Sequence, residues 1–261
     1  MTGSRFGASK STRHRSGVRF AELLKVQAKL AVREPYGVLA GIGLPAVLLV
    51  VFGFIGQAVP GNVGDTGLTI IDLWTPTLLV IAFIFIAISL PNTLVRDREI
   101  GWLRRVSTTP LHPAMLLAAQ LAIDLALAAA AIVIIILGGA LLFGASLHVQ
   151  ILSFGVALLL AIAEIFALGL MLVALVPTQT VASVVGGVVT FPLLFLAGLW
   201  VQPGQVGDPL QTIMYYSPSG AAARALVDAL FNGSPSYEAL LTMVVYTVLF
   251  GFIAIRYFRW E

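Results

Sequence analysis

Long apolar stretches alternate with short polar segments along almost the whole chain. A helix needs about 20 predominantly apolar residues to cross a bilayer. Stretches of that kind run from about residue 36 to 57, 70 to 90, 151 to 176, 181 to 200 and 239 to 258, and one more lies within 114–143. The pattern therefore predicts an all-α integral membrane protein with six transmembrane helices.

Two prolines mark places where these spans should bend or end. Pro45 lies inside the first span, where its missing N–H is expected to kink the helix. Pro91 follows the apolar part of the second span. We expect it to close that helix, because the residue before a proline avoids the helical conformation.

The one dense charge cluster of the chain separates the second span from the third. It reads Arg96-Asp97-Arg98-Glu99-Ile100-Gly101-Trp102-Leu103-Arg104-Arg105. Val95, Trp102, Leu103 and Val106 fall on one side of a helix, and Arg98, Gly101, Arg104 and Arg105 fall on the other. This predicts a short amphipathic helix at the membrane surface. It could be a positive anchor that fixes topology, or a contact helix that receives force from a soluble partner. On the loop alone we favour the anchor, because such anchors are common.

The chain begins with two polar segments. Residues 1–17 are basic and rich in Ser, Gly and Thr, which is typical of a disordered cytoplasmic tail that can touch anionic lipid. Residues 18–34 have a charged stripe and an apolar face, which predicts an amphipathic helix flat on the cytoplasmic leaflet. Residues 35–261 then form the six-span domain.

The distribution of basic residues predicts the topology. Six spans put both termini on one side of the membrane. The Lys and Arg residues then gather on that side, before the first span, after the second and at the end of the sixth, and only Arg224 is left for the other side. The positive-inside rule makes the basic side cytoplasmic.

The outer segment 201–238 is too apolar for a plain loop, and it contains signals for two short helices. Asp208 is expected to cap the first, with Pro209 as its first helical residue, and Ser219 is expected to cap the second, which Asn232-Gly233 would end. Both helices are too short to span, so we expect them to be re-entrant from the outer leaflet.

The outer segment has two interpretations, and the sequence favours neither of them. It could be a packed cap, or it could be an outer gate formed around Pro218, Arg224 and Asp228. Arg224 and Asp228 are spaced to pair across one helical turn.

Two carboxylates fall well within the predicted spans. Glu164 lies near the middle of the fourth span, and Asp124 lies in the cytoplasmic half of the third. Each would be costly facing lipid as a charge, so each should face a partner helix, face a water-filled path, or be protonated. Both are therefore candidates for a transport path, and helix-locking hydrogen bonds are the alternative. Asp72, at the mouth of the second span, is expected to be solvated.

Composition excludes several classes of function. The chain of 261 residues is 59% hydrophobic and 10% charged, and it contains no Cys. Its mean hydropathy is +1.00. A thiolate nucleophile or a Cys-ligated metal is impossible, and the three His residues have no ligand spacing, so we expect no metal site. No nucleotide-binding loop or catalytic motif is present, and no folded basic surface for nucleic acid is predicted.

The charged stretch resembles the inner loop of the type-2 ATP-binding-cassette (ABC) permeases. In that family a Glu and a Gly precede a basic helix and a Thr-Pro-Leu turn, and here Glu99, Gly101, Arg104 and Thr109-Pro110-Leu111 occupy those places. A second similarity runs from Phe191 to Gly198 and on through Pro203, Pro209, Pro218 and Arg224. It resembles the fifth span and the outer re-entrant helices of the same family. With the 18–34 helix, the resemblance covers nearly the whole chain beyond the tail.

The resemblance implies a half-transporter of a bacterial plasma membrane, similar to the daunorubicin-type exporter permeases. Two six-span subunits, identical or homologous, would pair around a central path and rest on two copies of a separate ATPase subunit. ATP and Mg²⁺ would bind that partner, and this chain would hold no cofactor. The implied coupling residues are Arg96, Arg98, Glu99, Gly101, Trp102, Arg104 and Arg105. A lipophilic or amphipathic substrate, such as a drug, a natural product or a lipid, is expected to leave the cell.

Two rival functions remain. A proton-coupled secondary carrier could use Glu164 and Asp124, but the chain shows no internally repeated halves of the kind found in many such carriers. A membrane-embedded enzyme or scaffold would need a catalytic cluster, and the sequence contains none.

Overall fold

Helix α4 (Ile70–Glu99) forms the centre of a helical bundle in the computed structural model, which describes residues 29, 39–58, 69–99, 113–145 and 150–258. All side chains from Leu78 to Ile84 are fully buried. An α-helix that is apolar all round must be surrounded by other helices or lipid. Here other helices surround α4 on several sides.

Six helices within the described ranges are long and apolar enough to cross a membrane. Besides α4, they are the π-helical turn η1 (Leu39–Gly43) continued by α3 (Leu44–Ala58), α6 (Pro113–Phe143), α7 (Ile151–Leu175), α8 (Gln179–Leu196) and α11 (Tyr237–Tyr257). The predicted all-helical class with six spans is confirmed.

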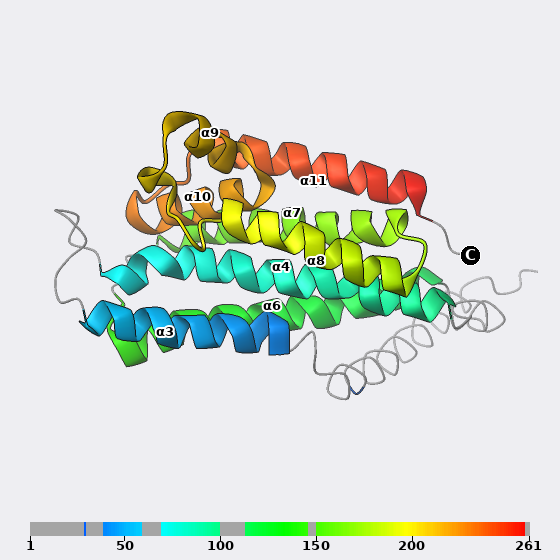
Figure 1. Cartoon of the computed structure of the whole chain (residues 1–261), viewed down its shortest axis with the longest axis horizontal. Coiled ribbons are helices and arrows are strands. Elements are labelled where there is room, and N and C mark those ends of the chain that lie inside the picture. Colours follow the sequence, from blue (N-terminus) through cyan, green and yellow to red (C-terminus); the bar gives the residue numbers. More distant parts are fainter. Residues whose placement is uncertain (1–28, 30–38, 59–68, 100–112, 146–149, 259–261) are drawn as a thin grey trace, which may run out of the picture.

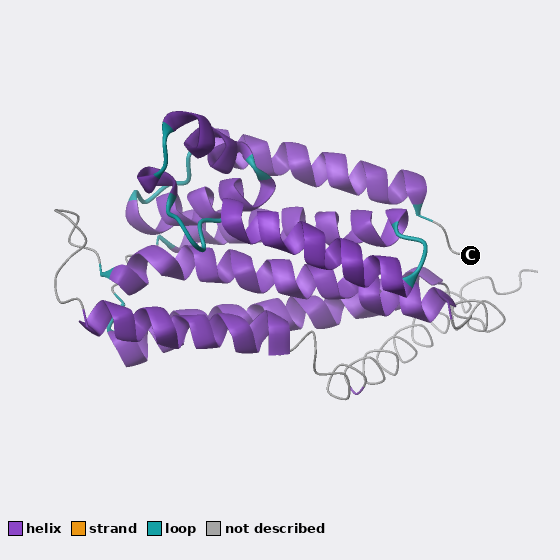
Figure 2. Ribbon diagram, in the orientation of Figure 1, coloured by secondary structure: helices purple, strands orange, loops and turns teal. Residues whose placement is uncertain are grey.

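The helices run roughly along one axis, with α4 between two groups (Figure 1). Helices α3 and α6 form one group, which packs on α4 and within itself. Helices α7 and α8 belong to the other group and also pack on α4, and α11 packs on α7. The ends of α4 and α11 that carry Arg98 and Arg256 lie at the same end of the bundle (Figure 1). The described part of the chain is helix and connecting loop throughout (Figure 2).

Helix α4 does not end at Pro91. It runs without a break for 30 residues, with Pro76 and Pro91 both inside it. The expectation that Pro91 closes the second span is therefore wrong. A helix of this length extends about 45 Å, more than the hydrocarbon thickness of about 30 Å, so its charged end can reach water while Pro91 stays helical.

A close crossing of α4 and α7 occurs at the carbonyl that Pro91 leaves without its helical donor. A proline at position 91 cannot donate to the carbonyl oxygen of Ala87, one turn earlier. A Cβ atom built on Gly169 of α7 would come within 2.5 Å of that same oxygen. Gly169 therefore lets the α7 backbone approach the carbonyl of Ala87, and a side chain at position 169 would prevent this approach.

Two short helices join α8 to α11, as the sequence predicts. They are α9 (Asp208–Tyr216), after the 3-10 turn η3 (Pro203–Gln205), and α10 (Pro218–Phe231). They lie at the end of the bundle opposite to the charged end of α4 (Figure 1).

The caps of these helices differ from the expectation. Gly207, not Asp208, is the N-cap of α9. Ser217 caps α10 by accepting from the N–H of Gly220 at 3.1 Å. Ser219 is already the second residue of α10, and its hydroxyl donates to the carbonyl of Leu193 in α8 at 2.7 Å. Gly233, at φ +76°, follows α10 as predicted.

Several predictions fall outside the described residues. The tail 1–17 does so entirely, and so does the amphipathic helix 18–34 apart from residue 29. The charged helix is described only as far as Glu99. Pro45 lies at the second residue of α3, where the first span changes from π-helix to α-helix.

We expect Gly169→Ala to separate α4 from α7 and to lower the free energy of unfolding by about 1–3 kcal/mol, as overpacking does. Gly155→Ala on the same helix is the matched control, because nothing lies within 4 Å of its built Cβ. That control should be neutral or slightly stabilising. Thermal unfolding of both variants in detergent tests this prediction. Equal unfolding midpoints for Gly169→Ala and Gly155→Ala would contradict the close crossing of α4 and α7.

Candidate functional site

The charged end of α4 contacts the turn between α7 and α8. The guanidinium of Arg98 donates from Nη2 to the carbonyl oxygens of Val176, at 2.6 Å, and of Pro177, at 3.1 Å. The neighbouring Glu99 accepts a hydrogen bond at 3.1 Å from the backbone N–H of Gln179 through its Oε1. Two adjacent side chains of α4 therefore hold both sides of one turn.

The two charges match the polarity of the helix ends that they meet. Helix α7 ends at Leu175, and the last carbonyls of a helix carry partial negative charge. Helix α8 begins at Gln179, and its first N–H groups carry partial positive charge. A guanidinium at the first end and a carboxylate at the second are both favourable.

The predicted coupling residues are divided between described and undescribed segments. Arg96, Arg98 and Glu99 lie in the last turn of α4, where the Nε of Arg96 is 3.9 Å from the Oδ1 of Asp97. The other predicted members lie outside the described residues; they are Gly101, Trp102, Arg104 and Arg105. The contacts of Arg98 and Glu99 with the α7–α8 turn were missed, because residues about 80 positions apart leave no local pattern.

Glu164 is enclosed in the bundle without a polar partner. Its side chain on α7 has no exposed surface, and neither carboxyl oxygen has a hydrogen-bond partner among the described residues. Helix α7 packs on α4, α10 and α11, so protein surrounds this side chain and lipid does not. A buried polar group without a partner is rare and costly, and an ionisable group inside a membrane protein is by default a functional candidate.

Asp124 is also buried, but it has a partner on its own helix. Only 1% of its surface is exposed, and both carboxyl oxygens accept from the Nε2 of Gln120, at 3.2 Å. No hydrogen bond joins Asp124 to Glu164, so the structure keeps these two candidates as separate sites. Within the described ranges, no group of three His, Asp or Glu side chains is arranged to hold a metal ion.

Asp72 is buried, so the expectation that it is solvated is wrong. Its side chain has no exposed surface, and its Oδ2 accepts from the N–H and the hydroxyl of Thr69, at 2.9 and 2.7 Å. Thr69 immediately precedes α4, and Asp72 is its third residue. The N–H of Asp72 also donates to the hydroxyl oxygen of Thr69 at 3.4 Å, so the two residues form a capping box at the start of α4, where the carboxylate has partners although it is buried.

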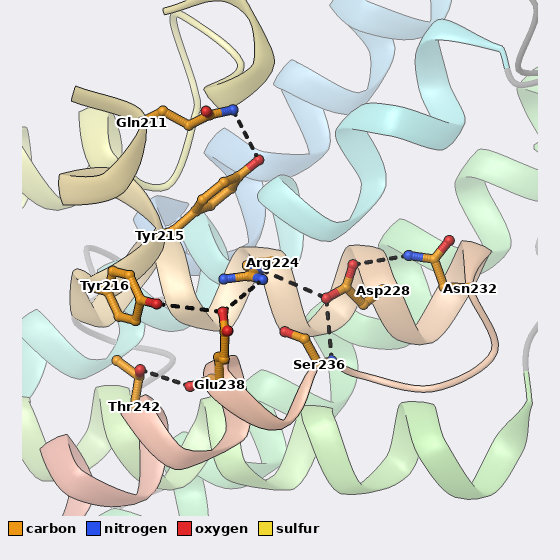
Figure 3. Close-up of polar contacts among 9 residues, drawn as sticks. All are labelled: Gln211, Tyr215, Tyr216, Arg224, Asp228, Asn232, Ser236, Glu238 and Thr242. Atoms are coloured by element: carbon orange, nitrogen blue, oxygen red, sulfur yellow. Dashed lines mark hydrogen bonds and ion pairs between the residues drawn. The ribbon is translucent and has the colours of Figure 1, made fainter. Parts of the chain in front are cut away.

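A polar cluster ties α9 and α10 to the start of α11 (Figure 3). Arg224 lies 3.9 Å from Asp228, which confirms the predicted pair, and its Nη2 lies 3.2 Å from the Oε2 of Glu238. The hydroxyl of Tyr216 donates to the same Oε2 at 3.4 Å, and the Arg224 guanidinium lies 4.7 Å from the ring centre of Tyr215.

The members of the predicted gate share one helix. Pro218 is the first residue of α10, and Arg224 and Asp228 follow on it. Asp228 also accepts from the N–H of Ser236 at 3.3 Å, which fixes the connection into α11. Glu238 was missed by the sequence reasoning, although its place in the first turn of a span is a detectable signal for a carboxylate that matches a helix start.

Comparison with known proteins gives a family and two relatives. A family model described as ABC-2 type transporter matches residues 19–231. "Putative transport permease YvfS" of Bacillus subtilis (strain 168) is 24% identical over 240 residues, which cover 89% of this chain and 94% of that protein. "Putative transport permease ycf38" of Cyanophora paradoxa is 25% identical over 278 aligned positions, which cover 97% of this chain and 94% of that protein.

We expect Arg224→Gln to loosen the attachment of α9 and α10, because it removes the contacts to Asp228, Glu238 and Tyr215 together. Amide hydrogen exchange in both helices should become about fivefold faster, because the free energy of local opening should fall by about 1 kcal/mol. Arg256→Gln is the control, since that exposed arginine stacks only loosely on its neighbour Tyr257, at 6.0 Å. Equal exchange in the two variants would show that the cluster does not hold the outer helices.

Proposed function

The chain belongs to the ABC-2 type transporter family, and on this premise we propose that it is the membrane-spanning subunit of an ATP-driven exporter. It is a multi-pass membrane protein and a transport permease rather than a catalytic enzyme. The proposed partner is a separate ATPase subunit, which binds ATP and Mg²⁺ and docks on the charged segment that begins at Arg96.

The continuity of α4 is the observation that carries this proposal. One 30-residue helix joins the charged residues Arg96, Arg98 and Glu99 to the fully buried centre of the bundle. A helix transmits displacement along its axis, and packed helices respond in discrete steps. A soluble motor that moved the charged end would therefore move the core. This favours a coupling element over a simple topology anchor.

We propose that the transported molecule is lipophilic or amphipathic and that Glu164 and Asp124 contact it during transport. Both are carboxyls enclosed within spans. In the described ranges the basic residues lie at or beyond the ends of the spans, so no described basic side chain neutralises these acids. Pro218, Arg224 and Asp228 on α10 would form part of an outer gate.

The remaining features of the proposed assembly follow from the family. Two permease subunits, identical or homologous, would face each other across the path and rest on two ATPase subunits in a bacterial plasma membrane. The basic ends of α4 and α11 would face the cytoplasm, in keeping with the positive-inside rule.

A proton-coupled carrier is the second candidate, and the state of Glu164 favours it. A carboxyl without any hydrogen-bond partner can gain and lose a proton without breaking an existing contact. In this alternative Glu164 and Asp124 would carry protons, and no ATPase would be needed.

Purification of the chain from its native membrane separates the two candidates. An ATP hydrolase should copurify, and vesicles containing the complex should export a fluorescent amphipathic dye when ATP is supplied. Transport that follows an imposed pH gradient and ignores ATP would exclude the exporter and support the carrier.

Glu164→Gln tests the path in the same vesicles. The amide keeps the shape of the side chain but cannot ionise, so dye transport should fall about tenfold or more if an ionised Glu164 binds the dye. Asp208→Asn, an exposed change of the same kind, should have no effect. Unchanged transport in Glu164→Gln would remove Glu164 from the path.

A further inference from the structure

Hydrogen bonds join both ends of α8 to α4. At one end, Glu99 accepts from the N–H of Gln179, and the Ser183 hydroxyl donates to the Oδ1 of Asn92 at 2.9 Å. At the other end, the hydroxyl of Thr77 in α4 donates to the carbonyl of Ala197, at 3.3 Å. These bonds span almost the whole of α8, which has α4 as its main helical neighbour.

The end of α7 is held by the same part of α4. Arg98 binds the carbonyls of Val176 and Pro177, directly before α8. Pro177 has no N–H, and Thr178 caps α8 by accepting from the N–H of Val181 at 3.3 Å. The turn therefore has its own internal cap, and the α4 side chains add a connection between helices that local helix formation does not require.

We propose that Arg98 and Glu99 are positioning residues that clamp the α7–α8 turn to α4, so that a displacement of the charged segment moves α8 together with α4. This inference rests on the proposed function, because it names the part of the bundle that would receive the movement produced by the ATPase. It gives Arg98 and Glu99 an internal target, to which they would pass on the force that the ATPase applies to the charged segment.

The chemistry of the two side chains suits a clamp. The guanidinium presents several donors in one plane and can hold two carbonyls at once. The carboxylate binds a helix N-terminus, which attracts negative charge. A load applied to either side of the turn therefore meets a charge-assisted hydrogen bond, which is stronger than one between neutral groups.

The first test measures the clamp without any transport. The chain contains no Cys, so spin labels can be attached at Thr93→Cys on α4 and Thr180→Cys on α8 alone. The distance distribution between the labels should be narrow in the parent chain. It should broaden when Arg98→Met and Glu99→Ala are combined, because both connections to the turn are then lost.

Two variants serve as controls in the distance measurement. Glu99→Gln should keep the narrow distribution, because its amide oxygen still accepts from the Gln179 N–H. Arg256→Gln, at the same end of the bundle, should also keep it. An unchanged distribution in the Arg98→Met, Glu99→Ala double variant would overturn the proposal.

The second test measures coupling in vesicles that contain the chain with its copurifying ATPase. The double variant should lower the amount of amphipathic dye transported per ATP hydrolysed by about fivefold, within the range expected for a coupling residue, while hydrolysis continues. Asn92→Cys and Ser183→Cys, bridged by a short bifunctional thiol reagent, should restore the ratio by replacing the clamp with a covalent link.

The bridged pair also tests whether α4 and α8 move as one body. In an otherwise parental chain the bridge should leave transport largely intact. Loss of transport on bridging would mean that the two helices must separate during transport, and it would overturn the proposal. An unchanged ratio of dye transported to ATP hydrolysed in the double variant would also overturn it. A complex without ATP-dependent transport would contradict the proposed function instead, and the distance measurement would still decide the clamp.

Discussion

The bundle depends on keeping one long, proline-containing helix intact where no water can reach its backbone. Each backbone polar group inside a membrane protein must be satisfied by protein, because lipid offers no partners. Helix α4 contains Pro76 and Pro91, and each removes one helical hydrogen bond. It remains continuous because other helices enclose it, and because Gly169 of α7 packs directly on the carbonyl that Pro91 leaves without a donor. The helix that links the charged segment to the core thus owes its continuity to its neighbours.

The two ends of the bundle are held by different chemistry. At the charged end, side chains of α4 bind the main chain of the α7–α8 turn, where a guanidinium meets carbonyls and a carboxylate meets an N–H. At the opposite end, side chains of α9, α10 and α11 bind one another around Arg224 and Glu238. Between the two ends the contacts are almost wholly apolar, apart from enclosed carboxyls such as Glu164 and Asp124. An apolar interior between two polar ends is suited to helices that shift against one another without breaking buried hydrogen bonds.

Side-chain hydrogen bonds decided two points at which sequence reasoning about local structure was wrong. Ser219 has a sequence position suited to a cap, but the carbonyl of Leu193 on α8 takes its hydroxyl, and Ser217 caps α10 instead. Asp72 was expected in water because it begins a span, but its bonds to Thr69 allow it to be buried. The partner of Ser219 lies on another helix, which the local sequence could not report, whereas Thr69 lies only three residues before Asp72 and is a partner that the sequence could have indicated.

The sequence by itself determined the class of the protein, because an apolar run of span length is a local property that decides whether a segment can cross a bilayer. It also determined that two short helices precede the last span and that Arg224 pairs with Asp228, since both follow from spacing along one helix. Only the tertiary structure decided that α4 continues through Pro91, that Glu164 has no hydrogen-bond partner in the described part of the chain, and that Arg98 and Glu99 meet opposite ends of the α7–α8 turn. Those outcomes depend on which helix lies against which, and that is set by packing between residues far apart in the chain.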